Sequence, residues 1–194
     1  QSIGAGDGIT FGNTGSSGSG TVTGAGSILS SGGRINVGGF DSSTGSLTIV
    51  GGGLVQNTGN GDFLGPPDMA IGSGEGSSGI VTVDGAGSKL VTYGLLVGHL
   101  VNSTASLTIQ NGGFASAELT GAGQGNGLTI GNNNGTANVT VTGAGSTLQI
   151  EAIGSGFLAG KEALIGGFAQ GSLLVEQGGT VDATGAGILV GGGL

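Results

Sequence analysis

The chain has 194 residues, of which 51 are glycine and none is cysteine, and its formal net charge at pH 7 is −8. Glycine without a Gly-X-Y period excludes collagen, and 36% apolar residues argue against disorder. Three scattered cations (Arg34, Lys89 and Lys161) are too few for a nucleic-acid backbone or an anionic membrane surface. Without disulfides, stability has to come from backbone pairing and a thin aliphatic core.

A short apolar pair followed by glycine recurs along the chain and divides it into units of one solenoid coil. These markers are Phe11-Gly12, Val37-Gly38, Ile71-Gly72, Val97-Gly98, Ile130-Gly131, Ile165-Gly166 and Val190-Gly191. Shorter and longer steps between successive markers both occur, and all of them fall within the usual length of one coil. The spacing predicts an all-β, single-stranded parallel β-helix of six to seven coils, each roughly 25 to 35 residues long.

Longer phrases repeat at about twice that distance. The motif GAGS begins at Gly24, Gly85 and Gly143, so that its copies are about 60 residues apart. These phrases predict a single solenoid domain, residues 1–194, with a partial coil (1–19) before macro-repeats 20–80, 81–138 and 139–194.

Each coil is predicted to contain three short strands: the apolar pair, an LTI or VTV strand, and a weaker stretch such as Leu90–Tyr93. In the middle strand apolar and polar residues alternate, which places the two kinds on opposite faces. The predicted inward residues are Leu47, Ile49, Val81, Val83, Leu107, Ile109, Val139 and Val141. The predicted outward residues are Thr48, Thr82, Thr108 and Thr140.

The glycines are interpreted as corner residues, because solenoid corners need positive φ or close backbone approach. A phosphate-binding loop at GAGS or at residues 121–127 would need a helix after it, and no helical period follows. The least regular stretch is 151–167, where one helical turn would fit.

The alternation of VTVxGAGSxL, LxVG and SLTIxNGG, from Phe11 to Gly193, resembles the glycine-rich repeats of type V secretion (autotransporter) passengers and related exported bacterial proteins. The resemblance implies a right-handed helix, export through a Gram-negative envelope, and display on or release from the cell surface. One departure is that family copies often carry Trp after GAGS, where this chain has Leu29, Leu90 and Leu148.

No catalytic, cofactor-binding or metal-binding residue is predicted. The single histidine, His99, follows a marker glycine and is expected to be a solvent-facing corner residue, since one histidine alone makes no metal site. Asp62 and Asp68 flank a Pro-Pro pair in a lengthened coil and are interpreted as a solvated loop. Glycoside cleavage needs a pair of carboxylates, and the repeats do not supply one. Asp84 precedes the second GAGS motif, whereas threonine precedes the other two.

No cofactor is predicted. Calcium is left open as an alternative, although the nonapeptide pattern GGxGxD has only isolated near-matches, at Asp7 and Asp62. The run Asn132–Asn134 is interpreted as a turn. The sequons beginning at Asn102, Asn134 and Asn138 are expected by chance in a chain this rich in Asn, Ser and Thr.

The leading hypothesis is a non-enzymatic extracellular module: an adhesin or passenger stalk, or a self-assembling filament or biofilm-matrix subunit. Two alternatives remain open. A β-helical polysaccharide lyase or hydrolase would share the architecture, but the scattered cations form no site for an acidic sugar. A carbohydrate- or receptor-binding module would use exposed aromatic residues such as Tyr93.

The two ends of the sequence match the internal marker strands. Ile9 and Phe11 lie in the first marker, and Ile188 and Val190 in the last. Either the sequence is an excerpt of a longer solenoid, or these residues mediate head-to-tail self-association of copies. A head-to-tail contact that does not close into a ring would produce a filament. No nucleic acid partner and no insertion of this segment into a membrane are expected.

Overall fold

The computed structural model describes residues 7–58, 68–120, 127–153, 162–167, 169–183 and 186–191. In these residues the chain forms 19 strands in three parallel sheets. Sheet A contains β1 (Asp7–Phe11), β4 (Arg34–Val37), β7 (Met69–Ile71), β10 (Leu95–Val97), β13 (Leu128–Ile130), β16 (Glu162–Ile165) and β19 (Gly187–Val190). Sheet B contains β2 (Ser17–Thr23), β5 (Thr44–Val50), β8 (Ser78–Asp84), β11 (Thr104–Gln110), β14 (Thr136–Thr142) and β17 (Gln170–Glu176). Sheet C contains β3 (Ile28–Ser31), β6 (Leu54–Asn57), β9 (Lys89–Tyr93), β12 (Phe114–Thr120), β15 (Thr147–Ile153) and β18 (Thr180–Asp182).

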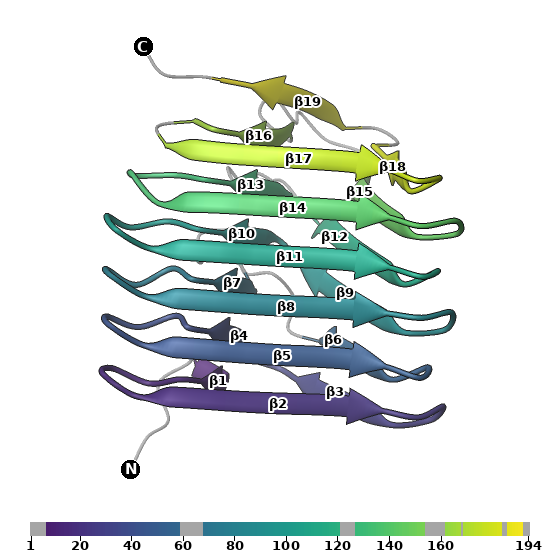
Figure 1. Ribbon diagram of the computed structural model, residues 1–194, viewed down its shortest axis with the longest axis horizontal. Helices are drawn as coiled ribbons and strands as arrows, with labels where there is room; N and C mark the ends of the chain where they lie inside the picture. Colours follow the sequence, from purple (N-terminus) through teal and green to yellow (C-terminus); the bar gives the residue numbers. More distant parts are fainter. Residues whose placement is uncertain are drawn as a thin grey trace.

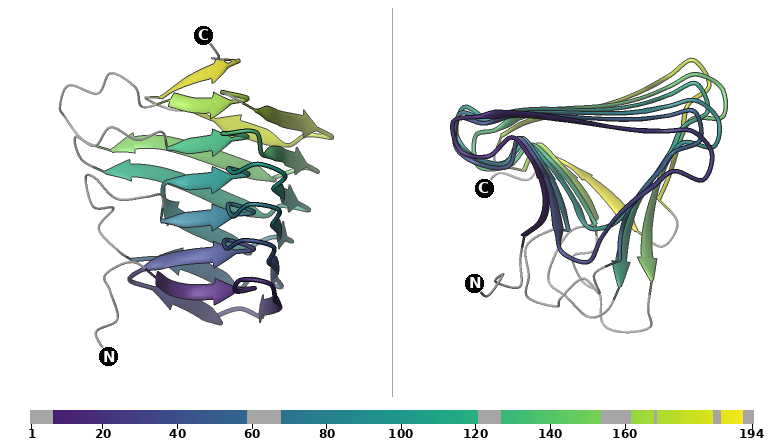
Figure 2. Two further views of the ribbon diagram at one scale, coloured as in Figure 1. Left: turned by 90° about the vertical axis from the view of Figure 1, so that its left-hand side faces the viewer. Right: turned by 90° about the horizontal axis from the view of Figure 1, so that it is seen from below.

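Each coil passes through sheets A, B and C once, so the three sheets form the sides of a triangular prism (Figure 2). In Figure 1 the strands of sheet B run from left to right at the front, the chain returns behind them, and each coil lies above the one before. The coils therefore wind in a right-handed sense, the hand expected when a twisted strand crosses over to a parallel neighbour. The predicted parallel β-helix is confirmed.

The strand register fixes the length of each coil. In sheet B the first positions of the strands align as Ser17, Thr44, Ser78, Thr104, Thr136 and Gln170. The steps between these positions correspond to coils of roughly 26 to 34 residues, the range usual for a solenoid of this kind. The seven apolar-glycine markers lie at the ends of the seven strands of sheet A. The steps in sheet B and the positions of the markers in sheet A both agree with the coil lengths expected from the sequence.

The core is a single aliphatic column enclosed by the three sheets. All eight middle-strand residues that the alternation places inward are at most 1% exposed, whereas the four threonines between them are half-exposed. Leu90 and Leu148 of sheet C and Ile71, Leu95 and Ile130 of sheet A complete the interior. The backbone groups of each inner coil pair with the coils above and below, which is why such a narrow core suffices.

The corner between sheets B and C alternates between two turn lengths. The four-residue GAGS turns close the first, third and fifth coils, and three-residue turns at 51–53, 111–113 and 177–179 close the second, fourth and sixth. The macro-repeat of the sequence therefore corresponds to two coils. The stretch expected to be irregular (151–167) contains the end of β15 and strand β16, and residues 154–161 lie outside the described part.

The GAGS serines connect successive coils at this corner. Ser88 Oγ accepts a hydrogen bond from Gly52 N (3.1 Å) in the preceding coil and donates one to Asp84 O (2.7 Å). Ser146 Oγ repeats both bonds, with Gly112 N (3.0 Å) and Thr142 O (2.7 Å). Ser88 and Ser146 are fully buried. The recurrent serine thus has a structural reason: it satisfies a backbone amide of the shorter turn.

Replacing Ser88 with Ala is expected to lower the free energy of unfolding by about 1–2 kcal/mol, because Gly52 N is left without a buried acceptor. The matched control is Ser27→Ala. Ser27 has the same motif position in the first coil, is half-exposed, and has no preceding coil to contact in the described structure. Urea denaturation followed by circular dichroism measures both. Equal losses for the two variants would show that the bond between coils is not the cause.

Candidate functional site

The outer face of sheet B carries side chains in columns that run along the stack, one residue from each coil. The first column is Ser17, Thr44, Ser78, Thr104, Thr136 and Gln170. The third column is Thr21, Thr48, Thr82, Thr108, Thr140 and Leu174. These two columns, with Ser19, Ser46, Ser106 and Ser172 of the second and Thr23 and Thr142 of the fourth, are called the hydroxyl face. Except at Leu174, it presents a regular array of uncharged hydrogen-bonding groups.

The hydroxyl face is interrupted at a few positions. Ile80 and Asn138 replace serine in the second column, and Leu174 replaces threonine in the third. Ile80 and Leu174 are 50% and 49% exposed. Carboxylates occur only in the fourth column, beside the turns, where Asp84 Oδ1 accepts a bond from Asn111 Nδ2 (2.8 Å) and Glu176 Oε1 one from Thr142 Oγ1 (3.4 Å). The first three columns of sheet B therefore carry no charge.

His99 lies in the corner between sheets A and B, as predicted, but it is half-buried rather than solvent-facing. Its Nε2 lies 3.3 Å from Asn133 Nδ2 of the next coil. Its Nδ1 is buried and makes no hydrogen bond within the described part of the chain. Burial lowers the pKa of His99 below its ordinary value, because it penalises the charged imidazolium. The sequence did not indicate this, since the neighbouring coil covers the ring only after stacking.

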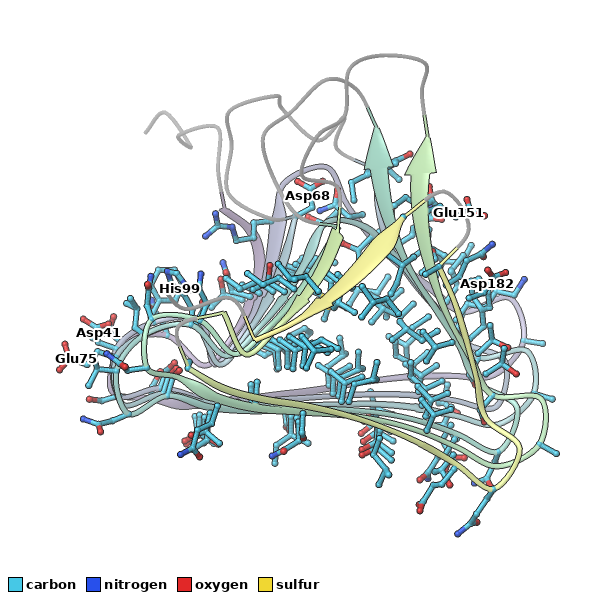
Figure 3. The ribbon with its side chains drawn as sticks, turned by 90° about the horizontal axis from the view of Figure 1, so that it is seen from above. Asp41, Asp68, Glu75, His99, Glu151 and Asp182 are labelled. Carbon is cyan, nitrogen blue, oxygen red and sulfur yellow. The ribbon has the colours of Figure 1, made fainter. Side chains whose placement is uncertain are left out.

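Of the predicted acidic loop pair, Asp62 lies outside the described residues. Asp68 precedes β7 and links strands through its backbone: Asp68 O accepts bonds from Ile35 N (2.8 Å) and Asn57 Nδ2 (3.2 Å), and Asp68 N donates to Tyr93 O (3.2 Å). Figure 3 shows Asp68 at a different corner of the prism from His99. Asp68 and His99 are therefore not brought together.

Two further acids share the corner with His99. Asp41 and Glu75 lie in successive coils, and Asp41 Oδ1 accepts a bond from Glu75 N (3.0 Å). Figure 3 places both at the outer edge of that corner. This geometry is that of a capped turn, in which a carboxylate satisfies a backbone amide.

The positions singled out for calcium give no assembled site. The side chain of Asp7 lies outside the described part, as does Asp62. In the run Asn132–Asn134, two residues have positive φ (Asn133 at 44° and Asn134 at 68°) and Asn132 Oδ1 accepts a bond from Asn133 N, as the predicted turn requires. Within the described ranges, no three or more His, Asp or Glu side chains are grouped closely enough to hold a metal ion.

Sheet C brings together side chains that the sequence did not connect. Tyr93, Glu118 and Glu151 occupy one outward column on neighbouring strands. Each carboxylate is held by the residue two positions before it: Ser116 Oγ donates to Glu118 Oε1 (3.3 Å), and Gln149 Nε2 donates to Glu151 Oε1. Their juxtaposition depends on the register of β12 and β15, which the loop between them hides from sequence inspection.

The residues predicted for self-association lie on the two outermost strands of sheet A. Ile9 and Phe11 of β1 are half-buried against the core. Ile188 and Val190 of β19 are 46% and 72% exposed. The outermost strand of sheet B, β17, adds Val175 at 44% exposure. The upper end of the described stack thus exposes apolar side chains at positions that are buried in every inner coil.

Comparison with family models, curated proteins and solved structures finds no match to this chain. Among the described residues no helix has the length and apolar character needed to cross a bilayer.

Proposed function

We propose that this chain is a structural β-solenoid module of the bacterial cell surface, either a stalk of a surface adhesin or a subunit of an extracellular filament or matrix. The observation that carries the proposal is the continuous in-register stacking of all three sheets around one aliphatic column. Such a rod holds its length without a wide core, which suits a spacer or a filament. The resemblance of its repeats to exported passengers supports an extracellular setting.

Head-to-tail pairing of copies is the specific form of assembly that the geometry favours. Strands β1, β2 and β3 at one end belong to the same three sheets as β19, β17 and β18 at the other. A second copy whose β1 pairs with β19 would extend sheet A in parallel and cover Ile188 and Val190, while sheets B and C, each with one strand fewer, would not pair directly at the junction. A contact of this kind does not close on itself, so it generates a filament.

The free edge of β19 offers a selective substitution. In the equivalent strand β10, Leu95 N donates to Gly127 O of the following coil (2.8 Å), while Gly98 N donates to Ile71 O of the preceding coil (2.9 Å). By this alternation the N–H groups of Ile188 and Val190 point away from the stack. Proline at Val190 therefore removes a donor from the free edge and leaves the bonds to β16 intact.

The intact chain is expected to form rods longer than one molecule at high concentration, visible by negative-stain electron microscopy and as early elution in sizing chromatography. Val190→Pro is expected to abolish the rods without changing the unfolding curve. Ser88→Ala, whose change is internal, serves as the control that still assembles. An intact chain that stays monomeric at every concentration, or a Val190→Pro variant that assembles equally well, would refute pairing through these strands.

A further inference from the structure

The hydroxyl face has two regular spacings. Along the stack, equivalent threonines of neighbouring coils are one strand separation apart, about 4.8 Å. Along a strand, outward side chains of alternate residues are about 6.6 Å apart. The strands of sheet B lie nearly parallel to one another in Figure 1, so these spacings persist over the coils. Apart from Ile80 and Leu174, the face is therefore a two-dimensional lattice of polar groups.

The groups of this lattice are held in place before any ligand arrives. Threonine is branched at Cβ, which restricts its χ1 angle, and Thr48, Thr82 and Thr108 are each flanked by threonines in the coils above and below. Within the described structure, the hydroxyls of Thr48, Thr82, Thr108 and Thr140 make no hydrogen bond to the protein, and these residues are half-exposed. Their donors and acceptors are directed to the solvent.

We propose that the hydroxyl face is an ice-binding surface. Hydrogen-bonded water molecules are about 2.75 Å apart, and tetrahedral geometry then places second-neighbour oxygens about 4.5 Å apart and repeats the layers about every 7.3 Å. The two spacings of the face agree with these to within roughly 10%. Threonine hydroxyls anchor water at these intervals, and the methyl groups between them order the water that surrounds them.

The absence of charge on the first three columns of sheet B favours ice as the ligand. The chain carries a net charge of −8, yet the first three columns of sheet B have none, and the described carboxylates of this sheet lie in the fourth column. A neutral lattice of donors and acceptors complements neutral ice. A sugar polymer would be held in large part by aromatic side chains stacked on its rings, and the outer face of sheet B presents none in the described strands.

The test uses the purified intact chain and ice itself as the probe. We expect a gap between the melting and freezing temperatures that grows with protein concentration, measured by nanolitre osmometry, and enrichment of the protein in a slowly growing ice hemisphere. The double variant Thr82→Lys/Thr108→Lys, which changes two in-register and half-exposed residues at the centre of the face, is expected to lose most of both effects.

The matched control is Gln56→Lys/Val91→Lys, which adds the same charge at two in-register, half-exposed positions on the outer face of sheet C. It is expected to keep both effects, and circular dichroism checks that both double variants are folded. The proposal is overturned if the intact chain shows no freezing gap and is excluded from ice, or if the control loses as much as the threonine variant. Retention on crystalline cellulose or chitin without retention on ice would assign the face to a polysaccharide instead. None of these outcomes depends on pairing of the coil ends.

Discussion

Replacing Ile109 with Asp is expected to lower the free energy of unfolding by roughly 4 kcal/mol or more, which places it among the most damaging single changes in the chain. Ile109 is 0% exposed and lies in register between Val83 and Val141, which are also fully buried. A carboxylate there has no partner in the aliphatic column. It would either remain charged at a high desolvation cost or take up a proton, and both outcomes favour the unfolded chain.

The control is the same substitution one residue earlier, Thr108→Asp. Thr108 is half-exposed on the outer face of the same strand, so its carboxylate stays hydrated, and a loss of about 1 kcal/mol or less is expected. Thermal and urea unfolding followed by circular dichroism compare the two variants. Equal destabilisation would mean that the assignment of inner and outer faces is wrong.

The inner and outer faces were predictable because period-two alternation maps directly onto the two sides of a strand. Leu107 and Ile109 are separated by Thr108 in the sequence, and the structure buries the first two and half-exposes the third. The corners were predictable for a similar reason. Marker glycines such as Gly98 and Gly131 have positive φ, which other residues adopt only with strain.

The surfaces were not predictable to the same degree, because they depend on register between coils. The step along the sequence from Thr82 to Thr108 is shorter than the step from Thr108 to Thr140, yet both pairs align. Unequal loops hide such columns from a search at one fixed period. The burial of His99 Nδ1 and the pairing of Glu118 with Glu151 are likewise products of the neighbouring coil.

The hydrogen bonds that the GAGS serines accept from the preceding coil also could not be predicted without the register between coils. The motif was recognised as a repeat, and its glycines were correctly assigned to a corner. The role of its serine was missed, because the partner, an amide of the shorter turn, belongs to another phrase in the preceding coil. The alternation of two turn lengths contains this information, but only once adjacent coils are placed in register.

Replacing Gly113 with Ala is expected to lower the free energy of unfolding by about 3 kcal/mol, a large effect for one added methyl group. A Cβ at Gly113 would lie 2.5 Å from Val83 O and 3.0 Å from Val83 C of the preceding coil. Both are backbone atoms of a buried strand and have no rotamer to change. The coils would have to separate at this corner, which weakens the bond from Phe114 N to Ser88 O (3.0 Å).

The same position is glycine in the other two three-residue turns, at Gly53 and Gly179, with the same contact to a valine carbonyl.

The matched control is Gly32→Ala. Gly32 is exposed, does not have a positive φ, and would place its Cβ with no atom within 4 Å. Alanine there costs nothing in the folded chain and restricts the unfolded one, so a gain of about 0.5 kcal/mol is expected. Urea unfolding of the two variants therefore separates the steric requirement for glycine from its general flexibility. If both substitutions shift the midpoint alike, the close approach of successive coils at Gly113 is not what demands glycine in these turns.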